Sequence, residues 1–389
     1  MKRLEGRAVP EKPFKLALIS NNAFSLYNFR GDLIQDLVFE GVKVYALAPD
    51  YDPNMKLKIA GLGALPVDYR LNRAALSFID DLQSCFSLFK TLRRIRPDIT
   101  LSYFMKPVIY GSIVAALVGV KQRYALVEGL GFVYQDGVHK TAKMRFVRAI
   151  ADRLYSLAFS LSAKVFFLNE QDIDTFADGG LIKRAKAVNL HGIGVNVDKL
   201  QIAAPVTDPV VFLLMARLLR QKGIGEYANA ARIVKRENPQ TRFILLGGTD
   251  PNPDSLTETE VQAWVDEGII EWPGKVADVT GYIRESSVYV LPSYYREGVP
   301  RSTQEAMAMG RPVITTDNVG CRETVIDGVT GYLVPVRDTP ALAAAMMKFV
   351  TNPETIVVMG QESRKLAERR FDVRAINKNI LGAMGLIAS

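Results

Sequence analysis

The feature that most constrains the fold is an alternation of short apolar segments with amphipathic ones. Residues Lys15–Ser20 (KLALIS) have the composition of a buried strand, and a loop over Asn21–Gly31 follows them. The pattern then predicts a helix over about Asp32–Glu40, which Gly41 ends, and a second strand over Val42–Leu47. A strand, loop, helix and strand in this order begin a doubly wound parallel sheet, so the sequence predicts an α/β fold.

The same alternation continues to the end of the chain. Further strands are predicted at Leu65–Tyr69, Ile99–Tyr103, Arg123–Val127, Lys164–Leu168, Val210–Met215, Phe243–Gly248, Val288–Leu291, Val313–Thr316 and Gly331–Val334. Helical spacing predicts two core-facing rows, Phe78, Leu82, Cys85, Phe89 and Leu92 in one helix and Met144, Val147, Ala151, Leu154 and Leu161 in another. The last helices are expected over Thr339–Val350, Pro353–Arg370 and Val373–Leu386.

The length of 389 residues favours two domains, because single cores stop growing at about 250–300 residues. Glycine and proline accumulate over His191–Asp208 without a clear period, which is the composition of a hinge. We therefore place a first domain at residues 1–195 and a second from residue 196.

Composition excludes several classes of protein. Two cysteines and two histidines provide neither a disulfide framework nor a recognisable zinc site, and no metal site is predicted. Residues Met1–Phe14 lack the apolar core of a signal peptide, and the longest apolar run, Val108–Val120, is too short to span a bilayer. These features lead us to expect a cytoplasmic protein.

The positive charge lies in the first half. Residues 1–200 hold 28 Lys and Arg against 19 Asp and Glu, a net charge of +9, whereas the remainder holds 21 against 22, a net charge of −1. Such asymmetry predicts an anionic partner, either a membrane surface or nucleic acid, although for any single residue a solvated helix face is the better explanation. No aromatic residues interleave these cations in a nucleic-acid motif, so we expect no nucleic acid. The expected contacts with anionic lipid are Arg93, Arg94, Arg96, Arg145 and Arg148.

The segment Tyr295–Gly310 (YREGVPRSTQEAMAMG) holds the strongest functional signal. It follows a predicted strand, and Ser302 with Glu305 has the spacing of a helix N-cap and its capping box. Glu297 is then on the loop and Glu305 one turn inside the helix. Amide groups at a helix N-terminus bind phosphate, and a carboxylate beside phosphate suits hydroxyl groups, so the segment favours a sugar nucleotide. Two Glu at this spacing are also common on solvated helices.

Three other strand ends carry candidate site residues. Arg217 and Lys222 follow one strand, where two cations can neutralise a diphosphate or form salt bridges. Gly31 begins a helix and permits close approach of a ligand to the backbone, although no G-x-G-x-x-G fingerprint is present. The sequence Glu128-Gly-Leu-Gly follows a third strand, where α/β folds bind ligands. Its glycines also suit a simple turn.

The pattern E-G-x-P-R-x-x-x-E-A-M-A-x-G-x-P-V-I over these residues resembles the E-x7-E block of retaining GT-B glycosyltransferases of family 4. Further blocks recur in that family's order from Lys15 to Leu381. The resemblance implies two Rossmann-like domains facing across a cleft, with the acceptor site in residues 1–195 and the donor site in 196–370. It also implies that the last helix, within 371–389, crosses back to the first domain.

The resemblance also implies roles for single residues. Arg217 and Lys222 match the family's diphosphate-binding pair, and Val276 lies in GKVADV, which resembles the segment that touches the nucleobase. Glu297 would hold donor-sugar hydroxyls and Glu305 the ribose. Backbone N–H groups of the donor loop would bind donor phosphate and sugar; that loop is Gly298, Val299, Pro300 and Arg301.

Many members of this family carry a His where this chain has EGLG, a variant that we associate with branches that build surface polysaccharides on lipid carriers. Glu128 is accordingly a candidate for contact with either sugar. The expected activity is metal-independent, retaining transfer from a UDP-linked sugar to a polyprenyl diphosphate-linked saccharide, at the inner face of the cell membrane and without a cofactor. A sugar-nucleotide epimerase of the same fold and a two-lobed binding protein without catalytic activity are the alternatives.

Overall fold

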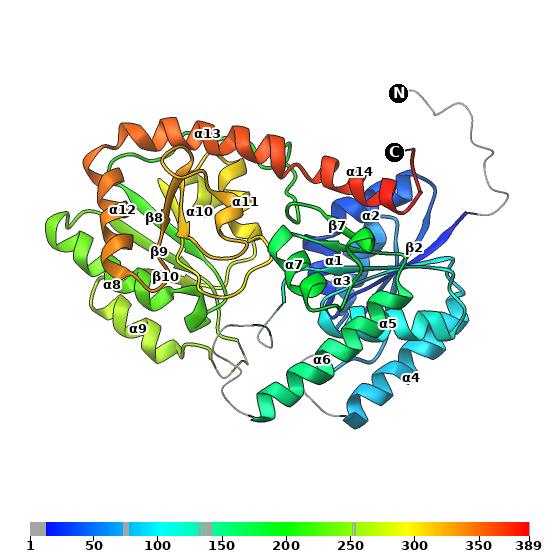
Figure 1. Cartoon of the computed structure of the whole chain (residues 1–389). Helices are drawn as coiled ribbons and strands as arrows, with labels where there is room; N and C mark the ends of the chain where they lie inside the picture. Colours follow the sequence, from blue (N-terminus) through cyan, green and yellow to red (C-terminus); the bar gives the residue numbers. More distant parts are fainter. Residues whose placement is uncertain are drawn as a thin grey trace.

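The computed structural model describes residues 13–72, 78–130, 134, 142–250, 252 and 254–388, without the side chain of Phe78. Its strands form two separate parallel sheets, shown on the two sides of Figure 1. The first sheet has the order β3-β2-β1-β4-β5-β6-β7 and the second the order β10-β9-β8-β11-β12-β13. The α/β fold with two doubly wound sheets is therefore confirmed.

The first sheet contains β1 (Lys15–Ile19), β2 (Lys43–Ala48), β3 (Leu65–Asp68), β4 (Ile99–Tyr103), β5 (Gln122–Val127), β6 (Lys164–Phe167) and β7 (Ala187–Asn189). The second contains β8 (Val211–Met215), β9 (Arg242–Leu246), β10 (Glu271–Gly274), β11 (Val288–Leu291), β12 (Val313–Thr316) and β13 (Gly331–Val334). Central strands such as β4, β8 and β11 are buried along their whole length, which is why β8 and β11 appear in the sequence as continuous apolar runs.

Helices cover both faces of each sheet, as right-handed crossovers require. The helices of the first half are α1 (Ala23–Asn28), α2 (Gly31–Phe39), α3 (Pro53–Gly61), α4 (Phe78–Ile95), α5 (Met105–Leu117), α6 (Ala142–Leu161) and α7 (Glu170–Asp178). Those of the second are α8 (Ile224–Glu237), α9 (Glu258–Asp266), α10 (Thr280–Arg284), α11 (Arg301–Ala308), α12 (Thr339–Thr351), α13 (Glu354–Arg370) and α14 (Val373–Ala383). In Figure 1, α4, α5 and α6 lie on one face of the first sheet, and α2, α3 and α14 on the other.

Two predictions about the first half were wrong. The loop over Asn21–Gly31 contains the helix α1, because the Asn22 side chain accepts from the amide of Ser25 and caps its first turn. In α4 the predicted core row included Leu82, whose relative exposure is 61%. The buried face of α4 instead runs through Ser84, Leu88 and Leu92, so the row predicted from spacing was displaced around the helix.

The chain passes between the two halves twice, and the passages lie against each other. The amide of Val195 donates to the carbonyl of Phe371 over 2.8 Å, and the amide of Val373 donates to the carbonyl of Val195 over 3.0 Å. Beyond this crossing, α14 packs against α2, and Asn377 donates to the carboxylate of Asp36 over 2.7 Å. Residues from Val373 onward thus return to the first half.

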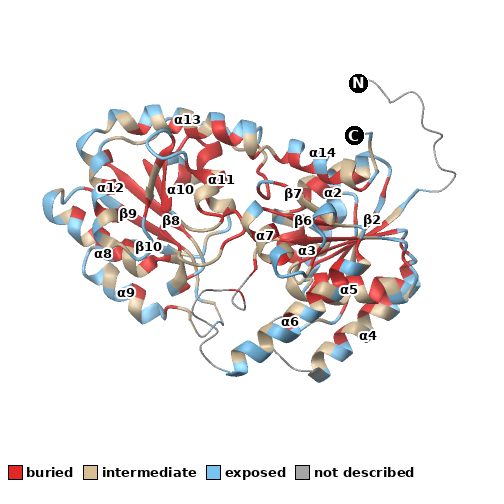
Figure 2. Ribbon diagram, viewed as in Figure 1, coloured by how far each residue is buried: buried red, intermediate tan, exposed pale blue. Residues whose placement is uncertain are grey.

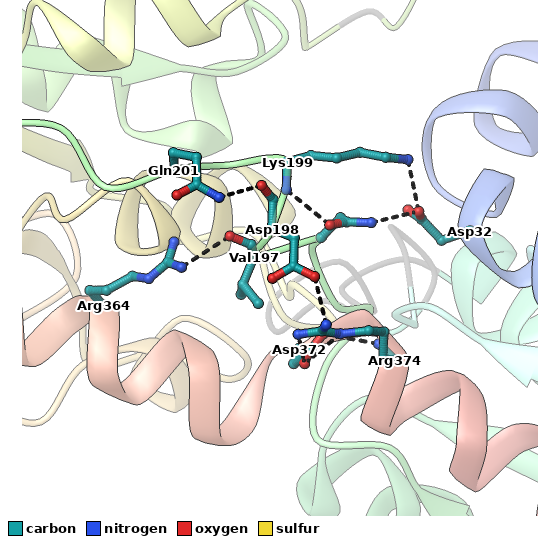
Figure 3. Close-up of polar contacts among 9 residues, drawn as sticks. Asp32, Val197, Asp198, Lys199, Gln201, Arg364, Asp372 and Arg374 are labelled. Atoms are coloured by element: carbon teal, nitrogen blue, oxygen red, sulfur yellow. Dashed lines mark hydrogen bonds and ion pairs between the residues drawn. The ribbon is translucent and has the colours of Figure 1, made fainter. Parts of the chain in front are cut away.

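Polar side chains hold the first crossing in place (Figure 3). Asn196 and Lys199 donate to one carboxylate oxygen of Asp32, over 2.9 and 3.0 Å. Arg374 contacts Asp198 at 2.6 Å, and Arg364 donates to the carbonyl of Val197 over 3.0 Å. The segment between the sheets is therefore bound to α2 of the first half and to α13 and α14.

Candidate active site

The candidate residues lie beyond the carboxyl ends of parallel strands. Glu128 follows β5, Arg217 and Lys222 follow β8, and the loop from Glu297 follows β11. Ligands bind at this end of open α/β sheets. Gly298 follows β11 of the second sheet and contacts Glu128, which follows β5 of the first. The carboxyl ends of the two sheets therefore face each other.

Gly298 lies where the two halves make backbone contact beside the candidate residues. A Cβ atom built on it would lie 2.0 Å from the carbonyl oxygen of Glu128, and one built on Gly129 would lie 3.1 Å from the amide of Gly298. Asn169, at the start of α7, donates to the carbonyl of Gly298 over 2.8 Å. On the other side, a Cβ on Gly320 would lie 2.2 Å from the same carbonyl oxygen. The EGLG and EGVP segments are therefore in backbone contact, and only glycine fits between them.

Lys222 and Glu297 form a largely buried ion pair next to this contact. Their side chains are only 14% and 10% exposed. Ser293 donates to the same Glu297 oxygen over 2.8 Å, and the ammonium group of Lys222 lies 5.4 Å from the centre of the Tyr295 ring. The pair brings together one cation and one carboxylate that sequence analysis placed on different loops.

Arg217 lies farther out than Lys222. Its side chain is 58% exposed and contacts Asp250 at 2.8 Å. No signal in the sequence marked Asp250 as a partner of Arg217. The two cations follow the same strand, but only Lys222 is enclosed.

Arg30 and Glu128 form a second buried ion pair, on the side of the first sheet. Arg30 is 1% exposed and its guanidinium carbon lies 5.2 Å from the centre of the Tyr103 ring. Burial raises the pKa of Glu128 above its ordinary value, while Arg30 and, more weakly, Arg301 act in the opposite direction. A carboxylate that a buried cation orients can accept hydrogen bonds from sugar hydroxyls.

Glu305 pairs with Arg301, one turn before it on α11, at 2.8 Å. The Arg301 guanidinium also lies over Phe29 of the first half, 5.2 Å from the ring centre. The predicted N-cap at Ser302 was wrong: α11 begins one residue earlier, after Pro300, and no side chain caps it. Ser302 instead accepts a hydrogen bond from the hydroxyl of Tyr289 over 2.6 Å.

The remaining predicted residues have different surroundings. Val299 is 4% exposed, and Gln304 donates to its carbonyl over 3.2 Å. Gly31 is the buried first residue of α2, and a Cβ there would make ordinary contact with Leu62. Val276 is half-buried in the loop after β10. None of these three joins the charged pairs.

A salt bridge crosses between the halves next to Glu297. Arg296 contacts the buried Asp172 at 3.2 Å and donates to the hydroxyl of Thr175 over 2.6 Å. Burial raises the pKa of Asp172 to about 6, which Arg296 and Asn169 partly counter. The loop that carries Glu297 is therefore fixed to α7 of the first half.

Comparison with known families identifies the second half. Residues 209–352, which contain Arg217, Lys222, Glu297 and Glu305, match the family model described as glycosyl transferases group 1. These residues are a group 1 glycosyltransferase domain. The Lys222–Glu297 pair thus lies within this domain, and the contact of Gly298 with Glu128 lies at its junction with the first half.

Relatives of the whole chain are also glycosyltransferases. The N,N'-diacetylbacillosaminyl-diphospho-undecaprenol alpha-1,3-N-acetylgalactosaminyltransferase of Campylobacter jejuni is 28% identical over 85% of this chain and 87% of its own length. The UDP-Gal:alpha-D-GlcNAc-diphosphoundecaprenol alpha-1,3-galactosyltransferase of Escherichia coli is 25% identical over 77% of this chain and 78% of its own. The names of both relatives state lipid diphosphate-linked sugars.

Solved structures match nearly all of the fold. Sucrose-phosphate synthase from Thermosynechococcus elongatus has a TM-score of 0.77 at 20% identity, over 95% of this chain and 97% of its own. Anabaena Alr3699/HepE in complex with UDP has a TM-score of 0.75 at 15% identity, over 96% of this chain and 100% of its own. The chain therefore has the GT-B fold expected from the sequence.

Several residues around the glycosyltransferase domain's junction were not predicted. Asn169 and Asp172 follow β6 and fit an ordinary helix N-terminus, because Asn169 also accepts from the amide of Asp172. Arg30 precedes Gly31 without any motif of its own. Among the described residues, no group of three or more His, Cys, Asp and Glu side chains is arranged to hold a metal ion.

Proposed function

We propose that the protein transfers a sugar from a nucleotide diphosphate sugar, with UDP as the expected nucleotide, to a polyprenyl diphosphate-linked saccharide, with retention of anomeric configuration. The observation that carries this proposal is the backbone contact of Gly298 with Glu128–Gly129 of the first half, directly after Glu297 of the Lys222–Glu297 pair in the glycosyltransferase domain. The relatives that act on lipid diphosphate-linked sugars support the acceptor class.

The donor would lie on the second half. Lys222 and Arg217 would neutralise the diphosphate and stabilise it as the leaving group, with no essential metal and no cofactor. Lys222 would then exchange part of its contact with Glu297 for phosphate oxygens, which frees Glu297 to hold donor-sugar hydroxyls. The uncapped first turn of α11 would offer amide groups to phosphate, and Glu305 would bind the ribose.

The acceptor saccharide would approach from the first half. The carboxylate of Glu128 is held by Arg30, and its backbone carbonyl lies against Gly298 at the junction. The carboxylate would accept hydrogen bonds from acceptor hydroxyls there. Closure of the halves, with Arg296 on Asp172 and Asn169 on Gly298, would exclude water and protect the donor from hydrolysis.

Thermal unfolding with a panel of ligands tests the donor site. In excess EDTA, one nucleotide sugar at about 100 times its Kd is expected to add about 2.7 kcal/mol of stability. Glu305→Gln should reduce the shift given by the nucleotide diphosphate alone, because a ribose contact weakens. Glu297→Gln should keep that shift and lose only the additional shift given by the sugar.

A matched control is Glu258→Gln, on an exposed turn of α9 in the same domain, which should leave every ligand shift unchanged. Two results would contradict the proposal: no nucleotide sugar stabilises the protein, or stabilisation appears only when a divalent metal is restored.

A further inference from the structure

Two helices of the first half extend past the sheet they cover. Helices α4 and α6 have 18 and 20 residues, so they are about 27 and 30 Å long, whereas strands of 5 and 6 residues such as β4 and β5 span about 17–20 Å. The buried side chains of α6 are Ala151, Tyr155, Ala158 and Phe159, so none of them lies in its first two turns. Each helix precedes a strand, so its first turns overhang the carboxyl edge of the sheet, the edge that also carries Glu128.

The overhanging turns expose large apolar side chains. On α4, Ile79, Leu82 and Phe86 are 68%, 61% and 59% exposed, and their spacing places them on one stripe of the helix. On α6, Phe146 and Ile150 are 68% and 44% exposed and share one stripe in the same way. Both helices pack against α5, and Figure 2 shows the first turns of both at one end of the first half. We name these five residues the apolar tip.

Basic residues follow the apolar tip along the same stripes. Lys90 and Arg93 continue the α4 stripe, and the ammonium group of Lys90 lies 4.4 Å from the centre of the Phe86 ring. Arg153 is exposed and continues the α6 stripe. Of the arginines expected to meet lipid, Arg148 is instead held on its own helix, since it pairs with Asp152 at 2.9 Å and lies over the Tyr134 ring.

The acidic residues at the start of α4 do not oppose an anionic surface. Asp81 contacts Lys106 at 2.8 Å, and Asp80 lies 3.6 Å from Arg70. On both helices, apolar side chains are followed by Lys or Arg on the same stripe. This order matches the layers of an anionic bilayer, where rings and aliphatic groups enter the acyl boundary and cations stay with the head groups. None of the described helices is long and apolar enough to cross a bilayer.

We propose that the apolar tip of α4 and α6 inserts into the surface of an anionic lipid bilayer and presents the carboxyl edge of the first sheet to it. This inference rests on the proposed function, and it names the surface by which the enzyme would reach a lipid-linked acceptor. The diphosphate of such an acceptor lies at head-group level, next to the sheet edge that carries Glu128. Attachment rests on apolar insertion as well as on charge.

Flotation with vesicles of phosphatidylglycerol and phosphatidylethanolamine tests the proposal. The variant Leu82→Ser/Phe86→Ser and the variant Phe146→Ser/Ile150→Ser are each expected to lower the partition coefficient about tenfold or more, because two apolar side chains no longer leave water. The matched control is Phe39→Ser/Leu57→Ser, on α2 and α3 of the opposite face, whose side chains are 86% and 73% exposed. That variant should float like the wild type.

The salt dependence of vesicle binding distinguishes apolar insertion from electrostatic attraction. At about 0.5 M salt, where charges are screened within a few ångströms, the wild type should keep a measurable part of its binding and the apolar-tip variants should keep none. Equal flotation of the wild type and the tip variants would overturn the proposal, as would complete release of the wild type by salt. A dimer in solution that the tip variants dissociate would also overturn it, because a second copy would then cover the tip.

The test is independent of the donor site. Tip variants should retain the wild-type thermal shift with nucleotide sugar and the wild-type rate toward a short-chain, water-soluble acceptor analogue. Their rate toward a long-chain acceptor in vesicles should fall. A wild type that binds vesicles through the tip but no nucleotide sugar would contradict the proposed function and leave the docking surface standing.

Discussion

Replacing Gly298 with alanine is expected to reduce sugar transfer by about 100-fold or more, because displacements of about 1 Å at a reacting site have effects of this size. The added Cβ would lie 2.0 Å from the carbonyl oxygen of Glu128 and 2.9 Å from Cδ1 of Leu168. Both atoms belong to the first half, so the clash opposes closure of the two halves. Transfer rates and the radius of gyration in solution are the measurements, and the variant should be slower and less compact.

The matched control for this prediction is Gly225→Ala. Gly225 lies in α8 of the same domain, and a Cβ there meets nothing within 4 Å. This variant should keep the wild-type rate and dimensions. Normal transfer by Gly298→Ala with an unchanged radius of gyration would show that the contact with Glu128 is not part of the active arrangement.

Lys222→Ala is expected to lower kcat/KM about 10–100-fold or more, since a charge-assisted contact contributes about 1.5–3 kcal/mol. The change removes a phosphate contact and also leaves the buried Glu297 carboxylate without its cation. Arg217→Ala should have a smaller effect, because Arg217 is 58% exposed and binds Asp250 in the absence of donor. Steady-state kinetics with thermal unfolding as a folding control measure both. A folded Lys222→Ala protein with the wild-type kcat/KM would place the donor site elsewhere.

The sequence predicted the strands and the edge of each sheet that carries the candidate site. Burial on both faces makes β8 and β11 continuous apolar runs, and the loops after these two strands carry candidate residues. The Tyr295–Gly310 segment was placed on its loop and helix for the same reason. Chain order and local pattern suffice for this level of description.

Partners could not be predicted, because they are far apart in sequence. Lys222 and Glu297 are separated by 75 residues, Arg30 and Glu128 by 98, and Asp172 and Arg296 by 124. Each pairing depends on how strands are ordered within a sheet or on how the two halves face each other. No periodicity within a segment carries that information.

Local predictions failed where tertiary contacts competed with them. Ser302 had the spacing of an N-cap, but the hydroxyl of Tyr289 engages it and α11 starts earlier. Leu82 had the spacing of a core residue, but α4 buries the face that carries Ser84 and Leu88, which leaves Leu82 exposed. Leu82, which its spacing assigned to the core, is thus one of the five residues of the proposed lipid-facing tip.

Transfer itself is the most direct measurement of the central claim. The wild-type protein, in excess EDTA, is incubated with a panel of nucleotide sugars and a polyprenyl diphosphate-linked saccharide, and the lipid-linked product is analysed by mass spectrometry. The account predicts an acceptor heavier by one sugar residue, formed from one donor, with the donor's anomeric configuration retained. An acceptor of unchanged mass, accompanied by epimerised or hydrolysed donor, would contradict it.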